Sequence, residues 1–247
     1  MSYFDKLQDL EYADRAILVG YDPKEDAMAQ MCAASIKKHT NSNIPVVPII
    51  RDYLLAYNVF NRPLDPRGST QFSITRFLTP YLMGFKGVAW FIDCDFLITR
   101  NAVEVFDHFD PQYAVQVVKH NYKPKNENKM WNQTQHMYPC KNWSSSVLYN
   151  CSHHKNKYLT PEFVYDAHPS YLHQFVWLNN NEIGELPLEY NFLVEEYNKP
   201  DKTPLAVHYT LGCPLFRNRR NVDYTRLFDS EFEATFGRSI TEEDLID

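Results

Sequence analysis

The first half of the chain alternates short apolar runs with amphipathic segments, and this alternation limits the possible folds more than any other feature. Apolar runs at residues 16–20, 44–50 and 88–92 predict strands. Between them, residues 25–39 and 70–83 carry apolar side chains at three- and four-residue spacing, which predicts helices. Pro80 should bend or shorten the second helix. Strand–helix–strand units build parallel sheets covered by helices, so we expect an α/β fold.

The second half is less regular. Apolar runs at 113–118, 145–149 and 204–210 predict three more strands, and residues 102–108 and 170–178 predict helices. The polar stretch 119–142 contains Trp131 and His136 and predicts a long loop. This loop either forms one wall of the acceptor site or a lid that closes over it, or it is disordered. The acidic segment after Tyr224 is expected to be a peripheral tail.

Length and composition indicate a folded globular protein, because 44% of the 247 residues are hydrophobic and 23% are charged. The net charge of -6, with acids and bases interspersed, argues against nucleic acid as a partner. No run approaches the roughly 18 apolar residues of a membrane span, so at most a peripheral membrane contact is expected. The five cysteines form no CxxC pair and the N-terminus does not resemble a signal peptide, which favours reduced thiols and a cytoplasmic location.

Two aspartates interrupt the most apolar strand. Residues 90–99 read WFIDCDFLIT, with Asp93 and Asp95 two positions apart. Burying one unpaired carboxylate is costly, and two close together repel each other. Ligands of parallel sheets bind beyond the carboxyl ends of strands, where two carboxylates can share a divalent cation. Mn²⁺ and Mg²⁺ prefer oxygen ligands, so we expect a metal site that bridges to a diphosphate; the other reading is an exposed loop with two unrelated acids.

Three other positions are candidates for the same site. Tyr21 and Asp22 follow the first strand and should lie at the same edge of the sheet. Arg76 is a cation within a largely apolar helix, where it is either a diphosphate clamp or half of a structural salt bridge. His208 ends an apolar run and is either a third metal ligand or a core histidine hydrogen-bonded to the backbone.

These segments together resemble metal-dependent glycosyltransferases of the GT-A fold. The similarity is greatest to glycosyltransferase family 8, which contains glycogenin and lipopolysaccharide galactosyltransferases, and to related bacterial and viral enzymes. It rests on segments that occur in the family's order over residues 16–216: GYDPKEDAMAQMCAASIKKH, QFSITRFLTPYLMGFKGVAWFIDCDFLI, NWSSSVLYN, YLHQFVWL, LPLEYN and HYTLGCP. The resemblance implies a single GT-A domain over 1–247, with a Rossmann-like mixed sheet, mainly parallel and flanked by helices. Residues 16–118 would bind the nucleotide sugar, 119–220 would form the acceptor and catalytic half, and 221–247 an acidic tail.

The resemblance also implies roles for individual residues. Asp93, Asp95 and His208 would hold Mn²⁺ or Mg²⁺. Arg76 would face the donor, and Tyr21 and Asp22 would lie near the nucleotide base. Gln174 would lie close to the reacting anomeric carbon, and Asn191 would line the same pocket. Gln174, Asp95 and Arg76 would thus be the catalytic residues.

The chain departs from the family pattern at three places. His173 stands where the family has an acid before the glutamine, and Ser144-Ser145-Ser146 replaces Asn-Ala-Gly. The family's C-terminal lysine that binds diphosphate has no match after Gly212, and Arg217, Arg219 or Arg220 are possible substitutes. These departures bear on the donor sugar more than on the fold.

The resemblance implies transfer of a sugar from a nucleotide-diphosphate sugar, expected to be a UDP-sugar, to a hydroxyl of a glycan or glycolipid acceptor, with retention of configuration. One alternative is a haloacid-dehalogenase-like phosphatase with Asp93 as nucleophile, because DCDFL resembles that motif. However, the phosphatase motif normally closes the first strand of its domain, and Leu97 stands where Thr or Val is usual. The other alternative is a non-catalytic relative that binds nucleotide sugars or glycans.

Overall fold

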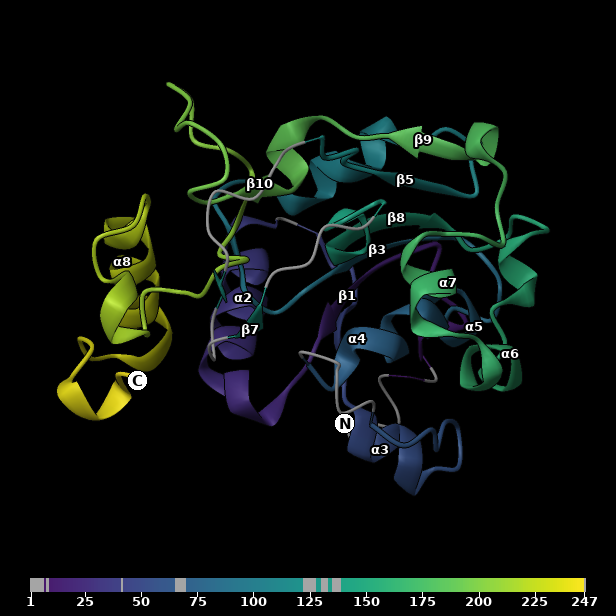
Figure 1. Cartoon of the computed structure of the whole chain (residues 1–247), viewed down its shortest axis with the longest axis horizontal. Helices are drawn as coiled ribbons and strands as arrows, with labels where there is room; N and C mark the ends of the chain where they lie inside the picture. The colour runs from purple at the N-terminus through teal and green to yellow at the C-terminus, as the bar shows by residue number, and fades with distance from the viewer. Residues whose placement is uncertain are drawn as a thin grey trace.

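The centre of the protein is a six-stranded sheet of order β2-β1-β3-β8-β5-β9 (Figure 1). The computed structural model describes residues 7, 9–40, 42–64, 70–121, 128–129, 133–134 and 139–246. The strands of this sheet are β1 (Arg15–Gly20), β2 (Val46–Ile49), β3 (Val88–Ile92), β5 (Val115–Val117), β8 (Ser146–Asn150) and β9 (Ile183–Glu185). β8 runs antiparallel to β3 and β5, whereas the other pairings are parallel. The expected mixed, mainly parallel sheet is confirmed.

Strand β3 lies in the middle of the core, as its apolar sequence predicts. Trp90, Phe91 and Ile92 are fully buried, and the Trp90 indole N–H donates to the Ser146 hydroxyl at 3.0 Å. This hydrogen bond satisfies the polar end of a buried aromatic side chain. The antiparallel register places Ile92 opposite Ser146. The end of β3 therefore lies beside the start of β8, and the backbone N–H of Asp93 donates to the Ser145 carbonyl at 3.0 Å.

A second, three-stranded sheet of order β10-β11-β4 adjoins the first. It contains β4 (Phe96–Ile98), β10 (Phe192–Leu193) and β11 (Ala206–His208). β4 is antiparallel to β11, and it follows β3 after three residues only. We did not predict β4 or β10 as separate strands, because such short strands have no periodicity of their own.

Helices cover both faces of the main sheet. The expected first helix is confirmed as η1 (Pro23–Glu25) followed by α2 (Asp26–His39), which ends with lysines and a histidine that complement the helix dipole. The expected helix at 70–83 consists of three short pieces, α4 (Phe72–Thr75), η2 (Arg76–Leu78) and α5 (Thr79–Leu82). Pro80 lies in the first turn of α5, where its missing N–H costs least. The predicted interruption at this proline is confirmed.

Other helices are short. They are α3 (Arg51–Ala56), η3 (Ala102–His108), η5 (Trp143–Ser145), η6 (Asn156–Tyr158), α6 (Pro161–Asp166), α7 (Pro169–His173), η7 (Asn180–Glu182), η8 (Leu188–Tyr190), η9 (Arg217–Arg219) and η10 (Glu242–Asp244). The predicted helix at 170–178 ends early, because Phe175 has a φ of 54°, which a right-handed helix cannot contain. No helix in the described part of the chain is long and apolar enough to cross a bilayer.

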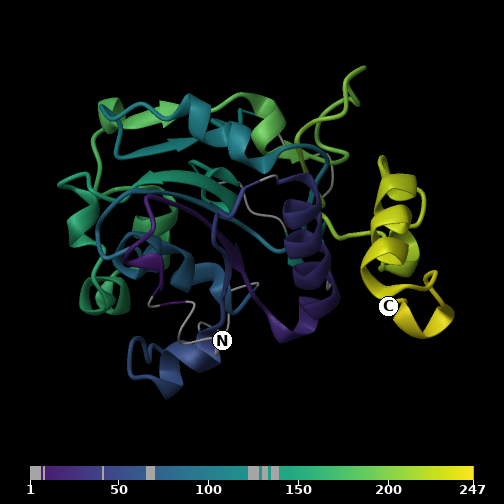
Figure 2. The ribbon, with the colours of Figure 1, turned by 180° about the vertical axis from the view of Figure 1, so that it is seen from behind.

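The C-terminal segment is not the peripheral tail that its acidity suggested. Residues 225–236 form α8 (Thr225–Phe236), which lies alongside α2 (Figures 1 and 2). Phe228 and Phe232 are buried in a second apolar cluster that includes Met28 and Met31 of α2. Glu233 is exposed, whereas Glu231 is buried against α2 and pairs with Lys38 at 2.6 Å. The segment is therefore an amphipathic helix, which its net charge alone did not reveal.

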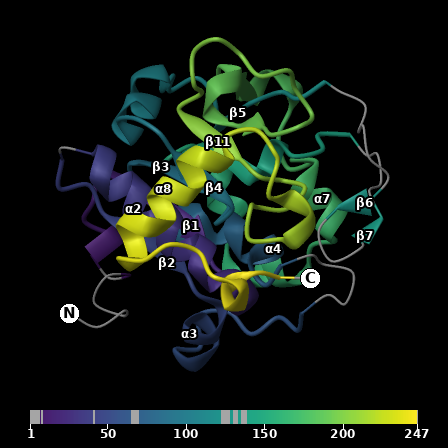
Figure 3. The same ribbon diagram turned by 90° about the vertical axis from the view of Figure 1, so that its left-hand side faces the viewer.

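The end of the chain returns toward the main body (Figure 3). Ile246 forms a β-bridge with Phe216. Within the polar stretch 119–142, β6 (Asn128–Lys129) pairs with β7 (Gln133–Thr134). Trp131 and His136 lie outside the described residues, so the acceptor wall or lid remains a prediction.

Candidate functional site

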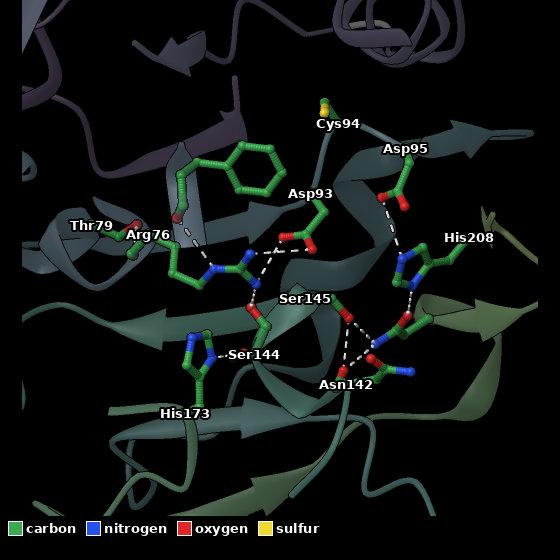
Figure 4. A network of polar contacts seen from close by, with 12 residues as sticks. Arg76, Thr79, Asp93, Cys94, Asp95, Asn142, Ser144, Ser145, His173 and His208 are labelled. Atoms are coloured by element: carbon green, nitrogen blue, oxygen red, sulfur yellow. Dashed lines mark hydrogen bonds and ion pairs between the residues drawn. The ribbon is translucent and has the colours of Figure 1, made fainter. Parts of the chain in front are cut away.

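The two aspartates of WFIDCDFLIT lie at the junction of the two sheets. Asp93 directly follows β3 of the main sheet, and Asp95 directly precedes β4 of the second sheet. His208 ends β11, opposite Phe96 in the β4 register, and its ring stacks on Phe96 with centroids 4.3 Å apart. One ligand atom from each of Asp93, Asp95 and His208 lies within 4.8 Å of the other two (Figure 4). The structure therefore brings the three expected ligands together.

His208 is held from both sides. Its Nε2 lies 3.3 Å from Asp95 Oδ1, and its Nδ1 lies 2.8 Å from Asn191 Oδ1. The Asn191 amide nitrogen donates to the Asn142 carbonyl and to the Ser145 hydroxyl, each at 3.0 Å. Asn191 is fully buried with both ends of its amide engaged. In this arrangement its side chain contacts His208, and its expected place in the donor pocket remains a prediction.

Arg76 forms a buried ion pair with Asp93. Nη1 lies 2.9 Å from Asp93 Oδ1, and Nη2 donates to Oδ2 at 3.3 Å. Nη1 also donates to the Ser144 carbonyl at 2.8 Å, and the guanidinium lies 5.2 Å and 5.3 Å from the ring centroids of Phe72 and Phe91. The structural salt bridge is thus present. The expected role of Arg76 as a diphosphate clamp stays a prediction.

The carboxyl groups here have perturbed pKa values. Burial raises the pKa of Asp93 to about 7, although the Arg76 charge acts against this change. Burial also acts to raise the pKa of Asp95, but the charge and hydrogen bond of His208 outweigh it and lower the pKa. Burial, reinforced by the charge of Asp95, raises the pKa of Glu25 to about 8. Carboxyl groups are therefore crowded at this end of the sheet.

This crowding fits a divalent cation. Within the described residues, Asp93 Oδ1 and Asp95 Oδ1 are buried oxygens that accept no hydrogen bond of good geometry, although each has an ion-pair contact. Two carboxylates and an imidazole are ligand types that Mn²⁺ accepts, and a cation between them would offset both burial and mutual repulsion. The residues present thus suit the metal that the sequence predicts.

Tyr21 and Asp22 lie at the end of β1, next to the end of β3. Asp22 is buried, and its carboxylate accepts from the backbone N–H groups of Lys24 at 2.9 Å and Gln71 at 2.8 Å. The Tyr21 hydroxyl donates to Asp26 at 3.0 Å. Asp22 therefore shapes the loop after β1, while a role of either residue near a nucleotide base stays a prediction.

Gln174 stands apart from this network. It is the residue after α7, and its partly exposed side chain forms no hydrogen bond with the described part of the chain. Its neighbour His173 is connected, because His173 Nδ1 lies 2.8 Å from the Ser144 hydroxyl and its ring packs edge-on against Phe77. The histidine that replaces the family's acid thus contacts the residue whose carbonyl holds Arg76.

The three candidate substitutes for the diphosphate lysine are all paired in this structure. Arg217 pairs with Glu242, Arg219 with Glu195 at 2.5 Å, and Arg220 with Asp229 at 2.9 Å. A cavity of about 30 Å³ is lined by Asp95 together with Leu215, Phe216 and Ile246. The geometry does not favour one of the three arginines.

Sequence reasoning gave no site role to Glu25, Asn142 or Ser145. Glu25 lies in the turn after β1, and its Oε2 accepts a hydrogen bond from the Cys94 thiol at 3.1 Å. Its place after a strand end was a usable signal, since that edge of the sheet was already expected to hold the site. Asn142 and Ser145 act through a carbonyl and a hydroxyl at the start of β8, for which the sequence carries no comparable signal.

No protein-family model matches the chain. The chain is 43% identical over 222 residues to Protein CDI of Arabidopsis thaliana, covering 88% of this chain and 85% of that protein. The chain belongs to the CDI family. This relative identifies the family without indicating a chemistry.

Solved structures show which fold the CDI family member adopts. The chain is similar to the glycosyltransferase GlyE of Streptococcus pneumoniae, with a TM-score of 0.57, 11% identity, and coverage of 91% of this chain and 62% of GlyE. It is similar to the bifunctional glycosyltransferase WbbM, with a TM-score of 0.59 and 12% identity. The match covers 93% of this chain and 52% of WbbM. It is also similar to the galactosyltransferase LgtC, solved with donor and acceptor sugar analogs, with a TM-score of 0.53 and 12% identity. That match covers 92% of this chain and 98% of LgtC. The chain thus spans about three fifths of GlyE and half of WbbM. The expected GT-A fold is confirmed, and LgtC agrees with the family 8 resemblance.

Proposed function

We propose that the protein is a metal-dependent glycosyltransferase that moves a sugar from a nucleotide-diphosphate sugar, a UDP-sugar, to a hydroxyl of a glycan or glycolipid. The observation that carries this proposal is the convergence of Asp93, Asp95 and His208 at the sheet junction of a GT-A fold. Fold alone does not fix function, so the ligand set at this position supplies the chemical reason. Retention of configuration, nucleotide-binding and acceptor-binding halves, and a cytoplasmic location belong to the same proposal.

Each residue has a defined task in this proposal. Asp93, Asp95 and His208 would hold Mn²⁺ or Mg²⁺, which when bound withdraws charge from the diphosphate and makes it a better leaving group. Arg76 orients Asp93 through the ion pair and faces the departing diphosphate, where fixed positive charge lowers the barrier. We assign Tyr21 and Asp22 to the nucleotide base and Gln174 to the surroundings of the anomeric carbon.

The rival readings make different predictions. A dehalogenase-like phosphatase would use Asp93 as a free nucleophile, yet here Asp93 is paired with Arg76 in a GT-A fold. A non-catalytic relative would bind nucleotide sugar with Mn²⁺ but release no nucleotide. Hydrolysis of a generic phosphoester and release of UDP therefore separate the three readings.

Ligand-dependent thermal stability tests the proposal. A ligand that binds only the folded state raises the melting temperature by mass action, by an amount that corresponds to about 2.7 kcal/mol at a hundredfold excess over Kd. We expect UDP and one UDP-sugar to raise the melting temperature only when Mn²⁺ is present. Asp95→Asn should abolish this shift, whereas the exposed Asp201→Asn should retain it. Unchanged Mn²⁺-dependent turnover in Asp95→Asn would show that the metal assignment is wrong.

A further inference from the structure

Hydrogen bonds among Asn142, Ser145 and Asn191 form a closed ring next to His208 and fix the orientation of the Asn191 amide. The Asn142 carbonyl can only accept, so the group that faces it at 3.0 Å must be the amide nitrogen of Asn191. A flipped amide would place its oxygen against that carbonyl oxygen. Asn191 Oδ1 therefore faces His208, and this assignment follows from the partners.

The orientation of Asn191 decides where His208 carries its proton. Asn191 Oδ1 is an acceptor only and lies 2.8 Å from Nδ1, so Nδ1 must be the protonated nitrogen. In the neutral imidazole the lone pair is then on Nε2. Nε2 lies 3.3 Å from Asp95 Oδ1, so a lone pair and a carboxylate oxygen face each other. They attract only if a second proton or a cation lies between them.

We propose that Asn191 is a positioning residue that holds His208 in the Nδ1-protonated tautomer and thereby makes Nε2 a metal ligand. This inference rests on the metal site of the proposed function. It assigns Asn191 to the support of a ligand instead of to direct contact with the donor. A second hydrogen-bond partner on a ligating histidine is what fixes ring orientation and tautomer in metal sites generally.

The ring is rigid because its anchor is a constrained residue. Asn142 has a φ of 61°, in the left-handed region that asparagine tolerates better than most residues. Its carbonyl accepts from the Ser145 hydroxyl at 2.7 Å as well as from Asn191. Ser145 in turn accepts from Asn191, so three polar groups agree on one amide orientation. Such an arrangement is expected where a nearby group must be held in a single protonation pattern.

Nitrogen-15 NMR of the histidine side chains in the metal-free protein tests the tautomer without any metal. The chain has nine histidines, and the His208 signals are those lost in His208→Gln. We expect Nδ1 of His208 to carry a proton in the metal-free protein, because it faces an oxygen that can only accept. A His208 with its proton on Nε2 alone would overturn the inference.

Asn191→Leu replaces the amide with an apolar side chain that has the same branching and the same number of heavy atoms. We expect Nε2-protonated His208 to appear and the affinity for Mn²⁺ alone, measured by electron paramagnetic resonance, to fall about 10- to 100-fold. Asn191→Asp keeps an acceptor for Nδ1–H, so it should retain the wild-type tautomer even if its melting temperature falls. It therefore serves as the conservative rescue if the leucine variant does not fold.

Asn156 provides the matched control. It is also fully buried, its amide nitrogen donates to two carbonyls at 2.7 Å and 2.8 Å, and its Oδ1 accepts from the Trp177 ring N–H at 3.3 Å. It contacts the end of β8 away from the site. Asn156→Leu should lower stability but leave the His208 tautomer and Mn²⁺ affinity unchanged. An equal loss of affinity in this control would refute the positioning role.

The two proposals fail in different ways. If the wild-type protein does not bind Mn²⁺, the metal-dependent function is wrong, whereas the tautomer measurement still stands. If the wild-type protein binds Mn²⁺ and Asn191→Leu binds it equally well, only the role of Asn191 is wrong.

Discussion

Arg76 and Asp93 face each other across a buried two-point contact, with Nη1 2.9 Å from Oδ1 and Nη2 3.3 Å from Oδ2. The side chains expose only 6% and 15% of their surface, so water screens the pair poorly. The pair joins the interrupted helix before β3 to the residue that directly follows β3. It therefore has a structural role that is separate from any role in catalysis.

Removing Arg76 alone should be more harmful than removing the whole pair. Arg76→Met leaves the Asp93 carboxyl buried without its cation, which should cost about 3–5 kcal/mol of unfolding free energy. The double variant Arg76→Met/Asp93→Asn should recover part of that loss. Urea denaturation measures both. Arg217→Met, which breaks a largely exposed pair with Glu242, should cost less than about 1 kcal/mol. A similar cost for the two single variants would contradict the interpretation.

Glu25 should make the metal-free protein less stable as pH rises. Its pKa is about 8 in the folded state against an ordinary value of 4.5. Between these values the folded state keeps a proton that the unfolded chain has released, so the associated stability falls with pH and is lost above about pH 8. Glu25→Gln should remove this slope and raise stability near pH 8.5 by on the order of 2 kcal/mol.

Urea denaturation in a metal chelator, at about pH 5 and about pH 8.5, measures the slope. The exposed Glu233→Gln should behave as the wild-type protein does. If Glu25→Gln has the wild-type pH slope, the Glu25 carboxyl is ionised across this range and the raised pKa is wrong.

Helix α8 should behave as part of the core. Phe228 is fully buried between α8 and the α2 side of the molecule, whereas its neighbour Leu227 is 43% exposed. Phe228→Ala should cost about 3–5 kcal/mol through lost burial and the remaining cavity. Leu227→Ala should cost less than about 1 kcal/mol, because little surface is withdrawn from water there. Equal melting temperatures for the two variants would restore the idea of a peripheral tail.

Gly20 should tolerate no side chain. A Cβ at this position would lie 2.5 Å from a ring carbon of Phe72, whose face carries the Arg76 guanidinium. Gly20→Ala should cost about 1–3 kcal/mol by overpacking and should displace Arg76. Gly237→Ala is the control, because a Cβ at that position has no atom within 4 Å. Its cost measures only the strain of a left-handed φ. A crystal structure of Gly20→Ala with Phe72 unmoved would disprove the crowding.

The sequence predicted five strands of the main sheet from their apolar runs, namely β1, β2, β3, β5 and β8. It did not predict β9, whose three residues have no periodic pattern of their own. It also placed Asp93, Asp95 and His208 correctly at strand ends, since carboxylates in an apolar run need a compensating partner. β4 and β10 escaped prediction because their form depends on pairing with β11, which is a tertiary effect.

The supporting residues were the hardest to predict. Asn191 was assigned to a pocket from a motif, but only the hydrogen bonds with Asn142 and Ser145 reveal that its amide faces His208. Glu25 resembles an ordinary acid at a helix start, and its perturbed pKa depends on Asp95, seventy positions further along the chain. A local sequence pattern gives no information about contacts between residues so far apart in the chain.

Only Asp93, Cys94 and Asp95 lie between the last residue of β3 in one sheet and the first residue of β4 in the other. A cation bound to Asp93, Asp95 and His208 would therefore cross-link the two sheets. Its affinity would then report how the sheets are aligned, because sliding one sheet against the other changes the separation of the ligand atoms. A substitution far away in β10, β11 or α8 that shifts the second sheet would be detected as weaker metal binding, even though every ligand is still present.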